Sequence, residues 1–262
     1  MIKGIIFDLD DTLTIHDELY DKNYLKIINK FSPKFKIDQE KILNIIISTI
    51  HQIGTEKKFS KYIQTKFGGR DILWGDCGGK GIVNEYLSKR FFEIRIEIWT
   101  EVFKNLCIEI SNKDILKIIN NYKFSMWEGI KTFDDVIPTL IKLKDIKLGV
   151  LTNGMDLHQR RKMAKAGILS FFSGANREIV TSSESIEGKP SKKPFEIILE
   201  KLGLSNDEVF MVGDRPESDI LGANNMGITS ILINRKKQKF KNNFIVPNYE
   251  ISNLKELLEI DL

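Results

Sequence analysis

Polar residues at the ends of apolar runs carry the chemistry that this sequence could perform. The first run, Gly4 to Phe7, leads into Asp8 and Asp10, two carboxylates spaced one residue apart. At that spacing one carboxylate could attack an electrophile while the other transfers protons. Ligands of open parallel sheets bind at the carboxyl ends of the strands. The sequence therefore places Asp8 and Asp10 at a candidate reaction centre.

Three later segments supply partners for these carboxylates. They contribute a hydroxyl with an amide, a lysine, and two further carboxylates: Thr152 and Asn153, Lys189, and Asp214 and Asp219. Each segment alone has an ordinary interpretation as a tight turn or as a charge at the start of a helix. Their occurrence in order, mostly directly after apolar runs, favours one shared site.

These motifs resemble those of the haloacid dehalogenase superfamily, in its phosphatase branch. The resemblance rests on four segments: Asp8-Leu9-Asp10-Asp11-Thr12, Thr152-Asn153-Gly154, Lys189-Pro190, and Gly213-Asp214 through Asp219. It covers the first dozen residues and the chain after about Lys147. It implies a doubly wound, Rossmann-like α/β core with a parallel sheet, and a helical cap inserted between the first and second motifs.

The resemblance also implies a role for each residue in phosphate monoester hydrolysis. Asp8 is expected to attack phosphorus and form an aspartyl-phosphate. Asp10 is expected to protonate the leaving oxygen and then to deprotonate water, a role favoured if nearby negative charge raises its pKa. Thr152 and Asn153 are expected to bind phosphoryl oxygens, and Lys189 to neutralise their charge.

A magnesium ion is the cofactor that this resemblance implies. Asp8 and Asp214 through their carboxylates, and Asp10 through its main-chain carbonyl, are the expected ligands, with Asp219 assisting through water or by positioning Lys189. These are hard oxygen donors, which Mg²⁺ prefers. The substrate class implied is a small phosphorylated metabolite such as a sugar phosphate.

Two segments near these motifs carry competing interpretations. Lys192 and Lys193 are rivals for the role of Lys189, which we prefer for its distance to Phe195, although Ser-Lys-Lys-Pro departs from the Asp-Pro that the family usually has here. The segment 159–162 resembles that of sugar-phosphate and acylneuraminate-phosphate phosphatases. We interpret it as an exposed helix face.

Four other functions share some of these features. A dehalogenase lacks an aspartate two residues after the nucleophile, whereas Asp10 is present. A signalling receiver carries its acceptor aspartate on a middle strand rather than on the first. A phosphomutase has the same core motifs, and a non-catalytic member could bind a phosphorylated ligand without hydrolysing it. These last two stay open as alternatives.

The elements that position these residues follow from hydrophobic periodicity. Short apolar runs alternate with helical patterns, which predicts parallel strands at residues 2–7, 148–151, 179–181, 209–212 and 230–233, and helices at 158–165, 195–202 and 220–226. Helical spacing predicts further helices at 42–53, 83–98 and 115–122, the last capped by Ser111. We expect a core of residues 1–15 and 125–262, and a cap of residues 16–124 hinged at 14–17 and 124–131.

A glycine-dense stretch lies in the predicted cap. Residues 67–81 fail as a Walker loop, because Trp74 replaces its first glycine and Gly81 its Ser or Thr. We expect a loop between cap helices, and we hypothesise that it faces the reaction centre with Arg70 or Lys80 touching substrate. His16, His51 and His158 show no metal or triad spacing. His16 could line the hinge, and the other two are assigned to surface or packing.

The composition bounds what the chain can be. Its 262 residues with 42% hydrophobic content can bury one large core or two modest ones, and a net charge of +4 is too small to indicate nucleic-acid binding. Cys77 and Cys107 lack a metal or disulfide pattern and are expected to be reduced and structural. With the first strand directly after Met1 and no apolar run of bilayer length, we expect a cytoplasmic protein, monomeric or homodimeric, without membrane partners.

Overall fold

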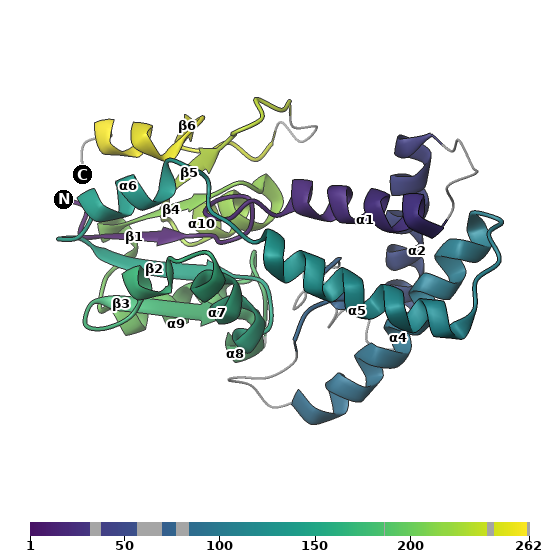
Figure 1. Cartoon of the computed structure of the whole chain (residues 1–262). Helices are drawn as coiled ribbons and strands as arrows, with labels where there is room; N and C mark the ends of the chain where they lie inside the picture. The colour runs from purple at the N-terminus through teal and green to yellow at the C-terminus, as the bar shows by residue number, and fades with distance from the viewer. Residues whose placement is uncertain (32–37, 57–69, 77–83, 186, 240–243, 261–262) are drawn as a thin grey trace.

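The structure is a computed structural model of residues 1–262. It describes all residues except 32–37, 57–69, 77–83, 186, 240–243 and 261–262 (Figure 1).

A parallel sheet of six strands forms the core, in the order β3-β2-β1-β4-β5-β6. The strands are β1 (Gly4–Phe7), β2 (Lys147–Thr152), β3 (Arg177–Thr181), β4 (Val209–Gly213), β5 (Thr229–Ile233) and β6 (Tyr249–Ile251). The register aligns Phe7 with Val150 on one side and with Val212 on the other. The residues that follow β1, β2 and β4 therefore meet at one edge of the sheet.

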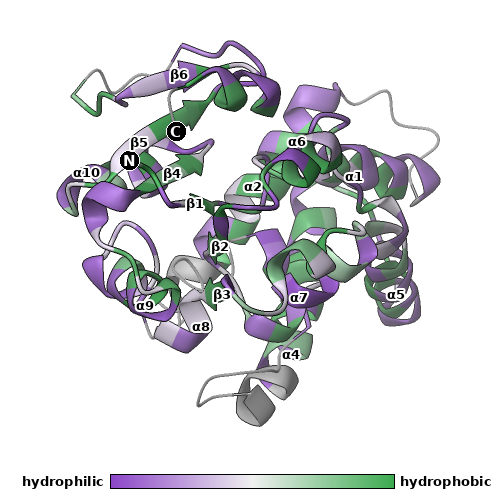
Figure 2. Ribbon diagram, turned by 90° about the vertical axis from the view of Figure 1, so that its left-hand side faces the viewer, coloured by the Kyte–Doolittle hydropathy of each residue, from purple (hydrophilic) through white to green (hydrophobic). Residues whose placement is uncertain are grey.

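Both faces of the sheet are buried, as parallel sheets require. Side chains alternate across β1: Ile5 and Phe7 pack against helix α6, while Ile6 packs in a separate apolar cluster with Phe195 and Ile198 of α9. Figure 2 shows the central strands β1, β2 and β4 as predominantly hydrophobic. The doubly wound α/β core predicted from the alternating pattern is confirmed.

The core helices connect these strands. They are α6 (Val136–Lys142), α7 (Asp156–Lys165), α8 (Ser182–Ser185), α9 (Lys192–Leu202) and α10 (Leu221–Asn225), with short turns η2 (Leu169–Phe172), η3 (Asn206–Glu208), η4 (Pro216–Ile220, a π-helix) and η5 (Leu254–Glu259). The helix predicted at 220–226 is thus a π-turn followed by α10. Periodicity missed α6, which is short and contains Pro138 in its first turn, where proline is tolerated. It also missed β6, a three-residue edge strand.

A second group of helices lies to one side of the sheet and has its own apolar core (Figure 1). It consists of α1 (Asp17–Phe31), α2 (Gln39–Glu56), the 3₁₀ turn η1 (Arg70–Leu73), α4 (Asn84–Asn105) and α5 (Asn112–Gly129). The side chain of Ser111 accepts a hydrogen bond from the backbone N–H of Asp114 at 3.2 Å, so the predicted N-cap of α5 is confirmed. We call residues 17–129 the helical region.

Two chain connections join the helical region to the sheet, and they run side by side. The backbone N–H of Ile15 donates to the carbonyl of Lys131 at 3.0 Å. Helix α5 continues unbroken past the boundary predicted after residue 124 and ends at Gly129, within the hinge segment predicted at 124–131. The second connection therefore begins after Gly129.

Candidate active site

Asp8 and Lys189 form a buried ion pair at the carboxyl edge of the sheet. The backbone N–H of Asp8 continues the ladder by donating to the carbonyl of Val212 at 2.8 Å. The ammonium group of Lys189 lies 2.6 Å from Oδ1 of Asp8 and 2.7 Å from Oδ1 of Asp219. Lys189 is 5% exposed, which means that its charge acts where water screens little.

The side chain of Asn153 holds the backbone of Lys189 in place. Its Oδ1 accepts from the N–H of Lys189 at 2.8 Å, and its Nδ2 donates to the carbonyl of Lys189 at 3.0 Å. The rival lysines, Lys192 and Lys193, are exposed in the first turn of α9. Lys189 is therefore the lysine that the fold brings to Asp8.

Three carboxylates converge beside this pair. Asp8, Asp214 and Asp219 each offer an oxygen within 4.8 Å of the others. Oδ1 of Asp214 is buried and has no hydrogen-bond partner among the residues that the structure describes. Burial, and then the charges of Asp8 and Asp219, raise the pKa of Asp214 well above its ordinary value. A cation would relieve this repulsion, and an oxygen-only donor set fits Mg²⁺.

Burial also raises the pKa of Asp8, to about 6, with Lys189 opposing the shift.

The close approach of Asp219 to the backbone of β4 depends on Gly213, because a Cβ at that position would lie 2.3 Å from Oδ2 of Asp219. Asp219 is an acidic residue in the first turn of η4, in keeping with the interpretation of a charge at the start of a helix. It lies within the π-turn, where its Oδ2 accepts from the backbone N–H of Arg215 at 3.0 Å.

Asp10 is paired with a lysine that the sequence did not identify. Nζ of Lys162 lies 2.6 Å from Oδ2 and 2.8 Å from Oδ1 of Asp10. Burial favours the neutral form of Asp10, but His16 and Lys162 outweigh it and hold its pKa below the ordinary value. The condition stated for its acid role, a pKa raised by nearby negative charge, is therefore not met here, because the dominant neighbours are basic.

The segment 159–162 was predicted to be an exposed helix face, but two of its four residues are buried. Gln159 and Lys162 are fully buried, because this face of α7 packs against the reaction centre. Nε2 of Gln159 donates to the hydroxyl of Thr152 at 2.7 Å. Since that hydroxyl oxygen already accepts a hydrogen bond, its own hydrogen is free to donate into the cavity.

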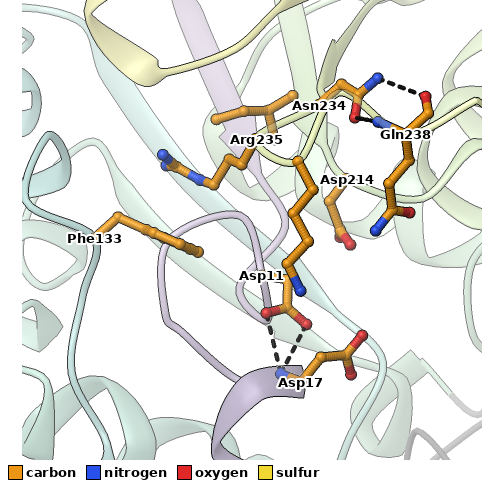
Figure 3. A pocket seen from close by; sticks show the side chains of 9 residues that line it. Asp11, Asp17, Phe133, Asp214, Asn234, Arg235 and Gln238 are labelled. Atoms are coloured by element: carbon orange, nitrogen blue, oxygen red, sulfur yellow. Dashed lines mark hydrogen bonds between the residues drawn. The ribbon is translucent and has the colours of Figure 1, made fainter.

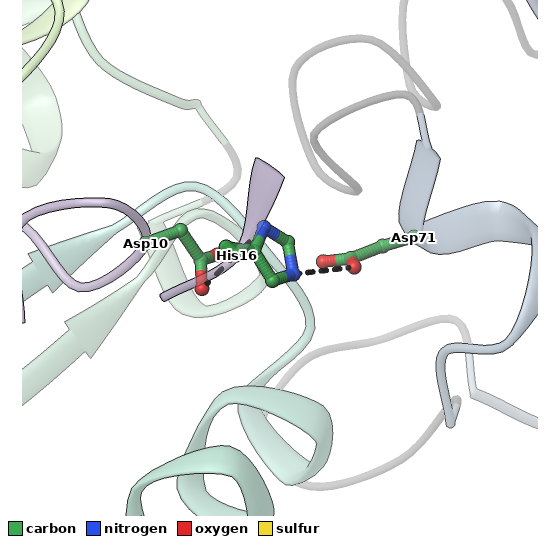
Figure 4. Close-up of side chains that lie close together, drawn as sticks. All are labelled: Asp10, His16 and Asp71. Carbon is green, nitrogen blue, oxygen red and sulfur yellow. Dashed lines mark ion pairs between the residues drawn. The ribbon is translucent and has the colours of Figure 1, made fainter. Parts of the chain in front are cut away.

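These side chains border one cavity of about 280 Å³. Residues of the core line it together with one residue of η1, Asp71. The full lining is Asp8, Asp10, His16, Asp71, Thr152, Asn153, Lys189, Arg215, Glu217 and Ser218. His16 stands between two of the carboxylates, with Nδ1 3.8 Å from Asp10 and Nε2 3.4 Å from Asp71 (Figure 4). The cavity thus lies between the sheet edge and the helical region.

A family model described as haloacid dehalogenase-like hydrolase matches residues 2–227. The chain belongs to this family. The glyceraldehyde 3-phosphate phosphatase of Methanopyrus kandleri is 29% identical to it over 267 residues, covering 99% of this chain and 97% of that protein. This likeness places the chain in the phosphatase branch and does not favour the dehalogenase, phosphomutase, receiver or non-catalytic alternatives.

Solved structures share the fold across the whole chain. A HAD phosphatase from Thermococcus onnurineus has a TM-score of 0.61 at 24% identity, covering 99% of this chain and 97% of its own. YfnB from Bacillus subtilis, a HAD-hydrolase whose structure contains magnesium, has a TM-score of 0.65 at 19% identity, covering 99% and 98%. These likenesses support the core and the helical region as the fold of a HAD-like hydrolase.

Asp71 is another site residue that sequence reasoning missed. The glycine-dense stretch does reach the cavity, but through Asp71 rather than Arg70, whose guanidinium lies 2.5 Å from Asp17 and 3.2 Å from Asp21. Lys80 lies outside the described residues. Nothing in the local sequence marks Asp71, because its partner Lys162 is 91 residues away.

The histidines and cysteines that the sequence offered differ in burial and in whether they line the cavity. His16 lies beside Asp10 and lines the cavity. His158 is fully buried, with its ring 4.4 Å from that of Trp74, as expected of a packing residue. Cys107 is exposed rather than part of a core, and Cys77 lies outside the described residues.

A smaller cavity of about 80 Å³ is lined by Asp214 together with Asp11, Asp17 and Arg235, among others (Figure 3). Asp11 receives two backbone N–H groups at the start of α1, and Arg235 stacks on Phe133 while binding Asp135 at 2.9 Å. Arg235 also donates to the carbonyl of Thr12 at 2.8 Å, and this bond fastens the loop after β1 to the segment that follows β5. Among the described helices, none is long and apolar enough to cross a bilayer.

Proposed function

We propose that this chain is a magnesium-dependent phosphomonoesterase that works through an aspartyl-phosphate at Asp8. The observation that carries the proposal is the arrangement around Asp8, which lines a cavity, contacts Lys189 at 2.6 Å and has carboxylate oxygens of Asp214 and Asp219 within 4.8 Å. An anionic nucleophile can approach a phosphate dianion only where cationic charge offsets their repulsion.

Each side chain has a task in this scheme. Oδ2 of Asp8 attacks phosphorus, while Lys189, the hydroxyl of Thr152 and the main chain at Asn153 bind the phosphoryl oxygens. Lys189 also keeps Asp8 ionised against the effect of burial. Asp10 gives a proton to the leaving oxygen and later takes one from water.

Asp10 meets substrate as part of a pair with Lys162, which lies 2.6 Å away. Lys162 stabilises its ionised form, the form that deprotonates water. Protonation for the first step requires the incoming phosphate to offset that stabilisation, because a dianion beside Asp10 favours its neutral acid.

The metal would be held by the carboxylates of Asp8 and Asp214 and the main-chain carbonyl of Asp10, with Asp219 assisting through Lys189. When bound, Mg²⁺ supplies positive charge to the transferring phosphoryl group.

The substrate class that we propose is a small phosphorylated metabolite, a triose or sugar phosphate. A cavity of about 280 Å³ is at the small end of ligand sites. A relative that spans nearly the whole chain is named for glyceraldehyde 3-phosphate. We also propose a cytoplasmic enzyme that acts as a monomer or homodimer.

Phosphate release tests this function. Wild-type protein with Mg²⁺ should release phosphate from glyceraldehyde 3-phosphate or p-nitrophenyl phosphate, and chelation by EDTA should stop it until Mg²⁺ is restored. Asp8→Asn should release none while keeping the circular dichroism of the wild type. Borohydride added during turnover should convert Asp8 alone to homoserine, read by mass spectrometry. Undiminished release by Asp8→Asn, or release without divalent metal, contradicts the proposal.

A further inference from the structure

Asp71 is positioned where the leaving group of a substrate would lie. In-line displacement at phosphorus places the leaving oxygen opposite Asp8. The polar side chains on that side run from Asp10 through His16 to Asp71 (Figure 4). Of the described residues in the helical region, Asp71 is the one that lines the cavity. The far end of the leaving group therefore meets a carboxylate.

The carboxylate of Asp71 is held rigidly by aromatic neighbours. The hydroxyl of Tyr20 donates to its Oδ1, and the indole N–H of Trp74 donates to that hydroxyl at 3.1 Å. Asp71 itself is 1% exposed. A buried, oriented carboxylate accepts hydrogen bonds strongly and repels anions strongly, because little water screens it.

The nearby lysine is shared between two carboxylates. Lys162 lies between the two carboxylates but is closer to Asp10, at 2.6 Å, than to Asp71, at 3.3 Å. Oδ2 of Asp71 has this contact with Lys162, while the contacts of Tyr20 and the histidines fall on Oδ1, so Oδ2 keeps lone pairs for a ligand. Glu217 adds another carboxylate to the lining.

Arg215 is the cation of the lining that could instead attract an anionic leaving group. Its side chain is half exposed, and its nitrogens lie 3.9 Å from Asp214 and from Asp17. It follows Asp214 directly in the chain, and its guanidinium is paired with Asp214 and Asp17 rather than with Asp71. Among the lining residues that the structure describes, the lysine and arginine are Lys189 and Arg215, and the buried Lys162 behind Asp10 and Asp71 is not one of them.

We infer that Asp71 selects the leaving group: it accepts a hydrogen bond from a hydroxyl of an uncharged leaving group and excludes one that carries a carboxylate. The inference rests on the proposed phosphatase function and narrows its substrates to phosphate esters of neutral, hydroxyl-bearing molecules. Like charges about 5 Å apart in a site of intermediate dielectric disfavour binding by at least about tenfold.

Two substrates with the same carbon skeleton test this selection. Glyceraldehyde 3-phosphate and 3-phosphoglycerate differ in having an aldehyde or a carboxylate at C1. For the wild type, we expect kcat/KM for the aldehyde to exceed that for the acid by at least about tenfold. Asp71→Asn keeps the shape of the side chain and removes its charge, so the ratio should fall about tenfold through a gain on 3-phosphoglycerate.

Asp76→Asn is the matched control. Asp76 lies five residues further on, bonded to Lys123 and, at 2.7 Å, to Arg161, and it is not part of the cavity lining. This variant should keep the wild-type ratio. An unchanged ratio in Asp71→Asn, or an equal gain in Asp76→Asn, overturns the inference.

The wild-type ratio decides the matter even if Asp71→Asn does not fold, since comparable kcat/KM values for the two substrates overturn the inference on their own. Hydrolysis of p-nitrophenyl phosphate separates failure of the Asp71 inference from failure of the proposed phosphatase function. If the wild type hydrolyses it but does not discriminate between the two triose compounds, only the role of Asp71 fails. If it hydrolyses none of the three, the proposed function fails with it.

Discussion

Replacing Lys162 by methionine tests how the helical region and the core are held together at the site. Nζ of Lys162 lies 2.6 Å from Asp10 and 3.3 Å from Asp71, and the side chain is fully buried. Methionine fills a similar volume without charge, so Lys162→Met leaves two buried carboxylates without their cation. Removing one partner of a buried ion pair costs about 3–5 kcal/mol.

That loss of stability should appear in thermal unfolding. Since about 1 kcal/mol shifts Tm by roughly 2–4 °C in a protein of this size, we expect Tm to fall by about 6–20 °C at neutral pH. Lys165→Met is the matched control on the same helix. Lys165 pairs with Glu128 at 2.8 Å, but both side chains are about half exposed, so this variant should stay within about 0.5 kcal/mol of the wild type.

The pH dependence of the Tm difference between Lys162→Met and the wild type gives a second readout. In the wild type, burial of Asp71 is outweighed by Lys162, His158 and His16, which hold its pKa well below the ordinary value. Asp71 then stabilises the fold above its unfolded pKa, and that contribution is lost as the pH falls through the folded pKa. Without Lys162, burial raises this pKa, and the variant loses stability as the pH rises.

The gap in Tm between Lys162→Met and the wild type should therefore be wider at about pH 8 than at about pH 5. Differential scanning fluorimetry across that range, with EDTA present to exclude metal effects, measures both effects. A Tm for Lys162→Met equal to that of Lys165→Met, or a gap that does not change with pH, refutes the reasoning that Lys162 compensates buried charge.

Three further perturbations have defined outcomes. Gly213→Ala should lower kcat by at least about tenfold, because the added Cβ would lie 2.3 Å from Oδ2 of Asp219. A phosphate-release assay measures this, and a kcat equal to that of the wild type contradicts the close approach of Asp219 to Gly213. Asn153→Ala removes two hydrogen bonds of 2.8 and 3.0 Å to the backbone of Lys189 and should also lower kcat about tenfold in the same assay; an unchanged kcat contradicts a positioning role for Asn153. Ser111→Ala removes the N-cap of α5 and should lower the free energy of unfolding by about 1 kcal/mol without changing kcat, read as a Tm shift of roughly 2–4 °C.

The strands and most helices were predictable because their signals are local. Runs such as Val209 to Val212 are apolar on both faces, and that pattern indicates a buried parallel strand whatever surrounds it. The cap of α5 at Ser111 likewise depends on three residues. By contrast, the helix predicted to end at residue 122 continues as α5 to Gly129, because no local stop signal lies before that glycine.

The sequence by itself determined the class of chemistry: carboxylates, a hydroxyl and a lysine at strand ends that a parallel sheet must bring to one edge. Only the tertiary structure decided their electrostatic environment. Lys162 meets Asp10 across 152 residues and Asp71 across 91, so no spacing records either contact. Because the pKa of a buried carboxylate depends on its spatial neighbours, the lowered pKa of Asp10 and the place of Asp71 in the cavity follow from how the helical region packs on the core.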